Sequence, residues 1–198
     1  MAISSVKIAN FALSKVGTDS TIETLTENSA EAKACNLWFE TARKQALSAY
    51  DWSFARKRLA LAVHGDDPPD EWAYRYQYPA DCVKARFVEN PVGKTADPVP
   101  FSVEMSADGT KSVLTDEVDA ILIYTKEETS PDYYTPYFIE LFATVLASRI
   151  AFSITHKAKL TEYLDAIARF LLIYAPAMDA VEQQEAAPRG ADWIRGRT

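Results

Sequence analysis

The 198-residue chain has little cysteine, histidine and glycine: two cysteines, two histidines and six glycines. Cys35 and Cys82 cannot build a disulfide framework, and so few cysteines suit a reducing compartment. The first ten residues, MAISSVKIAN, lack the basic start and apolar core of a signal peptide. These absences predict a soluble protein that is made in the cytoplasm of its host.

Positive charge is also in short supply, because 21 basic residues face 28 acidic ones and the net charge is -7. Such a chain does not bind nucleic-acid phosphates through an excess of cations. The most apolar stretch, residues 137–154, contains Glu140 and Arg149 and is short for a membrane span. With 48% apolar and 25% charged residues, the composition is that of a folded protein with its own core.

Signatures of catalysis are missing as well. There is no G-x-S-x-G or H-E-x-x-H motif, and His64 and His156 fall in different predicted layers. Residues 93–95, Gly-Lys-Thr, resemble the end of a phosphate-binding loop, but Val88 stands where that motif needs a glycine. We therefore predict no catalytic residue and no cofactor. Paired carboxylates stay open, because their pairing is spatial and the chain has many acids.

One acidic segment invites a test for metal binding. Residues 64–67, His-Gly-Asp-Asp, are followed by Asp70 and Glu71, but the segment lacks the alternating ligands and the terminal glutamate of a calcium loop. We predict a solvated acidic turn and no metal site.

The first third of the sequence predicts two helices. Ser4 and Ser5 can cap the first helix, and Gly17 can end it. Asn28 stands three residues before Glu31, which resembles a capping box at the start of a long second helix. Its apolar residues recur with helical spacing at Cys35, Trp38, Phe39, Ala42, Ala46, Ala49 and Tyr50, and Glu40, Arg43 and Lys44 occupy the other face.

The middle third predicts short strands over 56–63, 71–78, 83–88, 103–105, 112–114 and 120–125, in one small, mostly antiparallel sheet. Asp108-Gly109 is typical of a hairpin turn. Trp72, Tyr74, Tyr76 and Tyr78 alternate, which predicts an aromatic ladder on one face of a strand.

The last third is helical again. Thr135-Pro136 is typical of a helix start, and the apolar run to Ile154 predicts a central buried helix. We expect Arg149 to find a partner on another element or another subunit. A fourth helix carries a near-heptad stripe formed by Leu160, Tyr163, Leu164, Ile167, Leu171, Tyr174, Met178 and Val181.

Together these patterns predict a mainly-α α+β fold: an antiparallel helical bundle with a small inserted antiparallel β domain and an extended C-terminal tail. The predicted division is 1–53 for the first half of the bundle, 54–127 for the β-rich domain, 128–187 for the second half and 188–198 for the tail.

Three segments carry a resemblance to a known family. DWSFARKRLALA (51–62) follows the long helix, EWAYRYQYPADCVKARFV (71–88) forms the aromatic middle block, and ADWIRGR (191–197) lies in the tail. Together they resemble the head-to-tail adaptor proteins of short-tailed bacteriophages, the tail tubular protein A family. The resemblance is weakest over residues 90–119.

The resemblance implies a structural virion protein without enzymatic activity, located in the tail or neck and assembled in the host cytoplasm. Such adaptors form a ring, typically of twelve copies, that joins the portal protein to the tail nozzle protein and lets DNA pass without specific binding. It implies a monomer in isolation and no membrane. The tail match makes Trp193, Ile194, Arg195 and Arg197 candidates for portal contact, and the basic run Arg56, Lys57 and Arg58 is a weaker candidate for ring or portal contact.

Two alternatives remain at this point. A tail-associated protein could hydrolyse peptidoglycan with two carboxylates. A head-tail connector of a long-tailed phage would share the helical core, although the extra β segment and the aromatic block favour the short-tailed class.

Overall fold

A computed structural model describes residues 3–91 and 99–182, with side chains as far as Tyr174. The helices are α1 (Ser5–Val16), α2 (Ala30–Ala49), α3 (Pro136–Thr155) and α4 (Ala158–Glu182), with short 3-10 turns η1 (Ser53–Ala55) and η2 (Pro131–Tyr133). The strands are β1 (Arg56–Ala60), β2 (Tyr74–Gln77), β3 (Cys82–Val88), β4 (Phe101–Met105), β5 (Lys111–Thr115) and β6 (Ile121–Lys126).

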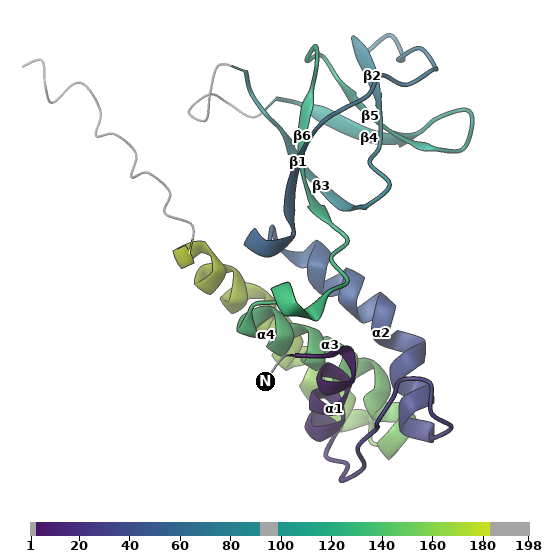
Figure 1. The fold of residues 1–198 in the computed structure, drawn as a ribbon, viewed down its shortest axis with the longest axis vertical. Coiled ribbons are helices and arrows are strands. Elements are labelled where there is room, and N and C mark those ends of the chain that lie inside the picture. The colour runs from purple at the N-terminus through teal and green to yellow at the C-terminus, as the bar shows by residue number, and fades with distance from the viewer. Residues whose placement is uncertain (1–2, 92–98, 183–198) are drawn as a thin grey trace, which may run out of the picture.

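The predicted fold class is confirmed: the chain is a mainly-α α+β protein. The four helices form a helical bundle at one end of the molecule, and the six strands form a β unit at the other (Figure 1). Because α1 and α2 precede the strands and α3 and α4 follow them, the β unit is inserted in the sequence between the two halves of the bundle.

Helix ends follow local capping chemistry. Ser4 accepts a hydrogen bond from the amide of Lys7, and Gly17 ends α1 in the left-handed region with φ 79°. The prediction that Asn28 caps the second helix is wrong by one residue. Ser29 is the N-cap, because its hydroxyl accepts from the amide of Ala32 at 3.1 Å and donates to Glu27 at 2.7 Å.

Helix α3 lies at the centre of the bundle, as its apolar run predicts, and packs against α1, α2 and α4. Its length and composition would also suit a membrane span, but here Phe138, Leu141 and Phe142 are buried in the bundle core. Arg149 is exposed and donates to Gln45 of α2 at 3.1 Å, so its partner lies on another element, as expected.

The fourth helix is less covered than its stripe suggests. Helix α4 packs chiefly against α3, and Leu164 and Ala168 are buried in that contact. Tyr163 and Tyr174 belong to the same stripe but are exposed. One neighbouring helix is therefore too narrow to cover all of the apolar surface of α4.

The strands form two sheets rather than the predicted single sheet. Their orders are β1-β6-β3 and β2-β5-β4, and all pairs are antiparallel. Isolated bridges between Val63 and Tyr76 and between Val88 and Val99 join the sheets at both sides. The strands therefore approach a closed barrel, which buries two inner faces where one small flat sheet would leave a face open.

The core of the β unit is small and consists of Leu61, Tyr76, Val88, Val113, Ala120, Leu122 and Tyr124. The β4–β5 hairpin is confirmed, with Gly109 at φ 81° in its turn. The aromatic ladder is wrong in its extent, because Trp72 and Tyr78 lie outside β2. Within that strand Tyr76 is buried and Tyr74 is partly exposed.

Candidate interaction surfaces

The basic run Arg56, Lys57 and Arg58 lies on β1, an exposed edge strand of its sheet. Each cation has an acidic partner: Arg56 pairs with Asp51 at 2.5 Å, Lys57 with Asp81 at 2.7 Å and Arg58 with Glu89 at 3.3 Å. Charged side chains on an edge strand discourage unwanted strand pairing. The run is thus a charge-balanced ribbon on the surface of the β unit, and its contact with a ring neighbour or the portal stays a prediction.

Asp81 is the centre of the most connected of these ion pairs. Besides Lys57, it accepts a hydrogen bond from the buried Tyr124 hydroxyl at 2.7 Å. Burial raises the pKa of Asp81, but the hydrogen bonds from Lys57 and Tyr124 outweigh burial, so its pKa lies below the ordinary value. Burial and the bond to Asp81 raise the pKa of Tyr124 to about 12. Asp81 is therefore an ionised anchor that holds β1 and β6 to the turn before β3.

The tail candidates Trp193, Ile194, Arg195 and Arg197 lie outside the described residues, as does the Gly-Lys-Thr stretch at 93–95. Their proposed contacts stay predictions.

His64 lies close to Asp66, which the sequence had grouped with it, and to Asp108, which the sequence had not. The other acids of that group, Asp67, Asp70 and Glu71, are not part of this cluster. The ring nitrogens lie 3.9 Å from an Asp66 oxygen and 3.7 Å from an Asp108 oxygen, on the wall of a hollow of about 380 Å³. Nδ1 of the ring accepts the Asp66 amide hydrogen at 3.0 Å, so the neutral ring carries its proton on Nε2, which faces Thr110 at 3.2 Å. Both nitrogens are engaged, and a metal ion would have to displace one of these bonds. The arrangement suits a histidine that holds its own turn to the β4–β5 hairpin better than it suits a metal site.

A shallow groove of about 460 Å³ lies between α1 and α3, which we call the α1–α3 groove. Ile3, Phe11, Pro136 and Ile139 form its apolar lining, and Ser14 lies beside them. An ion pair between Lys15 and Glu140, 2.5 Å long, lies at the same groove.

The exposed side of α4 carries four large side chains, Tyr163, Phe170, Ile173 and Tyr174, which we call the α4 face. Ile173 is 79% exposed and Phe170 is 63% exposed. The rings of Phe170 and Tyr174 stack with their centroids 5.8 Å apart. Residues 163, 170 and 174 are seven and four positions apart, so they lie along one side of the helix.

Two arginines that the sequence interpretation did not select join the bundle to the β unit. Arg86 of β3 donates to the carbonyl oxygens of Leu47, Ser48 and Tyr50 at the end of α2, and to Thr125 at 2.8 Å. Helix α2 ends at Ala49, its C-cap is Tyr50 and not a glycine, and its last turn contains no basic residue. The last carbonyls of α2 therefore need a hydrogen-bond donor from another element. The missing cap is the sequence feature that indicated a donor such as Arg86.

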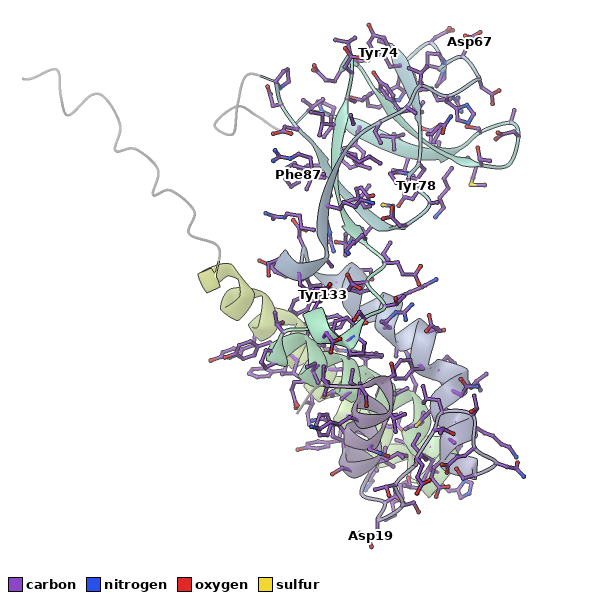
Figure 2. The ribbon with its side chains drawn as sticks, viewed as in Figure 1. Asp19, Asp67, Tyr74, Tyr78, Phe87 and Tyr133 are labelled. Carbon is purple, nitrogen blue, oxygen red and sulfur yellow. The ribbon has the colours of Figure 1, made fainter. Side chains whose placement is uncertain are left out.

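Arg43 provides the second connection and corrects a prediction. The helical spacing placed Arg43 on the solvent face of the second helix, but the residue is buried. It forms ion pairs with Glu40 at 2.5 Å and with Glu127, just after β6, at 2.6 Å. The partner that explains its burial lies 84 positions away, so the local pattern could not indicate it. We call these contacts of Arg43 and Arg86 the joint. The joint lies where the helices meet the strands, a region that the label of Tyr133 marks in Figure 2.

No protein-family model matches this chain, and a search of the curated proteins finds no significant match.

Proposed function

We propose that the protein is a structural adaptor of a short-tailed phage virion, which docks between the portal and the nozzle as one member of a ring. The observation that carries the proposal is the presence of exposed apolar surface on both parts of an elongated molecule (Figure 1). The α4 face lies on the bundle, and Val63 and Met105 are exposed on the β unit. Separate exposed apolar areas are typical of proteins that bind more than one protein partner.

Two of the three segments that carry the family resemblance lie within the described residues, and their contacts support the proposal. In the first segment, Trp52 is buried in the bundle core, and its indole donates to the carbonyl of Ala46 at 2.9 Å. In the second, Asp81 holds β1 and β6, and Arg86 caps α2. Trp52 thus stabilises the bundle and Asp81 the β unit, and Arg86 holds the two parts together, as an adaptor needs in order to present one partner to another.

Charge supports passage of DNA without binding. The net charge is -7, and each cation of the only dense basic run on the described residues has an acidic partner. A ring of such subunits carries a net negative charge, so it does not attract phosphate groups through an excess of cations, and counterion release contributes little to DNA affinity.

The experiment mixes the purified protein with portal rings from the same phage and follows complex formation by size exclusion and electron microscopy. We expect a complex with a ring of this protein beneath the portal. If no complex forms at any ionic strength, the proposal is wrong. Zymography on cell-wall substrate tests the hydrolase alternative in parallel, and clearing would favour that function.

A truncated variant tests the tail assignment within the same experiment. Deletion of Ala191–Thr198 should leave the circular dichroism spectrum unchanged and reduce portal binding at least tenfold, because the Trp193 anchor and two arginines are lost. Lys33→Ala, a change at an exposed position of α2, is the matched control and should bind like the parent protein. Undiminished binding by the truncated chain would contradict the tail assignment alone.

A further inference from the structure

We propose that the α4 face of one copy packs into the α1–α3 groove of a second copy. The inference rests on the proposed function, because it identifies the subunit contact of the ring. Its two halves, however, are described surfaces of this chain and do not depend on the portal.

The α4 face is apolar surface that remains exposed although the opposite side of the helix packs against α3. Leu164 and Ala168 face α3, whereas Phe170, Ile173 and Tyr174 face outward from the same helix. Large exposed apolar patches on a protein surface mark interaction sites. The stacked rings of Phe170 and Tyr174 with Ile173 beside them form a ridge, which needs a concave apolar partner.

The α1–α3 groove has the complementary shape and chemistry. Its apolar lining comes from α3, from α1 and from Ile3 just before α1. None of the α4 residues with described side chains lines it, so the ridge of the same copy does not occupy it. Phe11 within the lining is itself 40% exposed. A volume of about 460 Å³ suits one or two large side chains of a neighbouring copy.

Charge distribution favours a second copy over an acidic or basic partner. Among the α4 residues whose side chains the structure describes, the charged ones are Lys159, Glu162, Asp165 and Arg169, and their charges sum to zero. The groove carries one cation and one anion, Lys15 and Glu140. Two copies that each carry -7 repel one another, so their contact must avoid the acidic regions.

Those acidic regions lie elsewhere on the molecule. Asp19 marks the far end of the bundle and Asp67 the far end of the β unit (Figure 2). The stretch 17–32 contains four acids and no lysine or arginine, and so does 64–74. The α4 face and the groove are therefore charge-balanced surfaces between two acidic ends, where the repulsion between copies is smallest.

A contact of this kind is heterologous, because it joins two different surfaces. Each copy uses its face on one neighbour and offers its groove to the other, so the contact propagates and closes into a ring if the rotation allows. A face that paired with itself would stop at a dimer. This difference makes the proposal testable on the isolated protein by covalent trapping, which captures a weak contact between subunits that are monomers at equilibrium.

The test is disulfide cross-linking of the full chain in a Cys82→Ser background, at high protein concentration. Cys35 stays, because it is fully buried. Ser14→Cys places a thiol in the groove, and Ile173→Cys places one on the face; both positions are exposed, so the fold should tolerate both changes. We expect the double variant to give a ladder of dimers, trimers and larger species on non-reducing gels. A mixture of the two single variants should stop at the dimer.

The controls decide between this contact and its competitors. Leu37→Cys, also highly exposed but on α2, replaces Ser14→Cys in a matched double variant and should give no ladder. Dimers from Ile173→Cys alone would overturn the proposal in favour of a self-pairing face, and a double variant without multimers would overturn it as well. Because no portal is present, a ladder combined with failed portal binding would refute the proposed function and leave this contact standing.

Discussion

The bundle and the β unit are stabilised by different means. The bundle core is extensive and mostly apolar, with edge-to-face aromatic contacts such as Trp52–Phe138 at 5.2 Å and Phe39–Phe142 at 4.9 Å. The β unit has a small core in which two tyrosines supply much of the volume. Both hydroxyls are used: that of Tyr76 donates to the carbonyl of Glu117 and that of Tyr124 donates to Asp81.

This difference indicates which part can leave apolar surface exposed for binding partners. The bundle buries enough apolar area around α3 to leave one side of α4 uncovered without losing its fold. The β unit has less apolar area to bury, and it compensates with closed strand pairing and polar anchors that fix each strand. Truncation in the bundle core should therefore cost more than removal of a polar anchor in the β unit.

The largest expected effect is that of Trp52→Ala. Trp52 is buried among Tyr50, Phe54 and Phe138, so its removal leaves a cavity and breaks the hydrogen bond from the indole to the Ala46 carbonyl. We expect the free energy of unfolding to fall by about 3–5 kcal/mol. Urea unfolding followed by circular dichroism measures the loss.

Phe170→Ala is the matched control in the same bundle. Its ring is mostly exposed, so we expect a change within about 0.5 kcal/mol. Equal losses from the two variants would break the contrast between the covered core and the uncovered α4 face.

The second effect concerns the joint. Arg86→Met keeps most of the side-chain volume but removes the donors that reach three carbonyl oxygens at the end of α2 and Thr125. Because those carbonyls lose a charged donor while half-buried, we expect a loss of about 2–3 kcal/mol. Thermal unfolding followed by circular dichroism gives the value.

Lys84→Met is the matched control, since Lys84 lies two residues earlier on the same strand and is exposed. It should leave the unfolding temperature nearly unchanged. If Arg86→Met behaved like Lys84→Met, the two parts would not be held together by this arginine.

Sequence patterns predicted what depends on near neighbours in the chain. The cap at Ser4, the stop at Gly17 and the hairpin turn at Gly109 are decided within a few residues. The division into two sheets was missed because the β1–β6 pairing joins residues such as Arg56 and Thr125, which periodicity cannot connect. Burial of Arg43 was missed for the same reason.

The candidate surfaces divide in the same way. Periodicity identified Tyr163 and Tyr174 as part of an apolar stripe but could not tell which side α3 covers, because coverage depends on tertiary packing. The basic run at 56–58 was visible in the sequence, but the acids that balance it come from three separate segments. Arg86 was indicated only by the uncapped end of α2.

The smallest effect tests the polar anchor of the β unit. Asp81→Asn removes the carboxylate that pairs with Lys57 and accepts from Tyr124, and we expect a loss of about 1 kcal/mol at neutral pH, because the site is partly exposed and screened. The pKa of Asp81 is lower in the folded protein than its ordinary value of 3.8, so its stabilisation is complete above that value and is lost as the pH falls through the folded pKa. The urea midpoints of the parent and of Asp81→Asn should therefore differ at pH 7 and converge in acid.

Asp67→Asn, an exposed change at the far end of the same unit, should follow the parent at both pH values. A gap between parent and Asp81→Asn that stayed constant into acid would show that the carboxylate charge is not what anchors β1 and β6, and would leave the β unit dependent on its small apolar core alone.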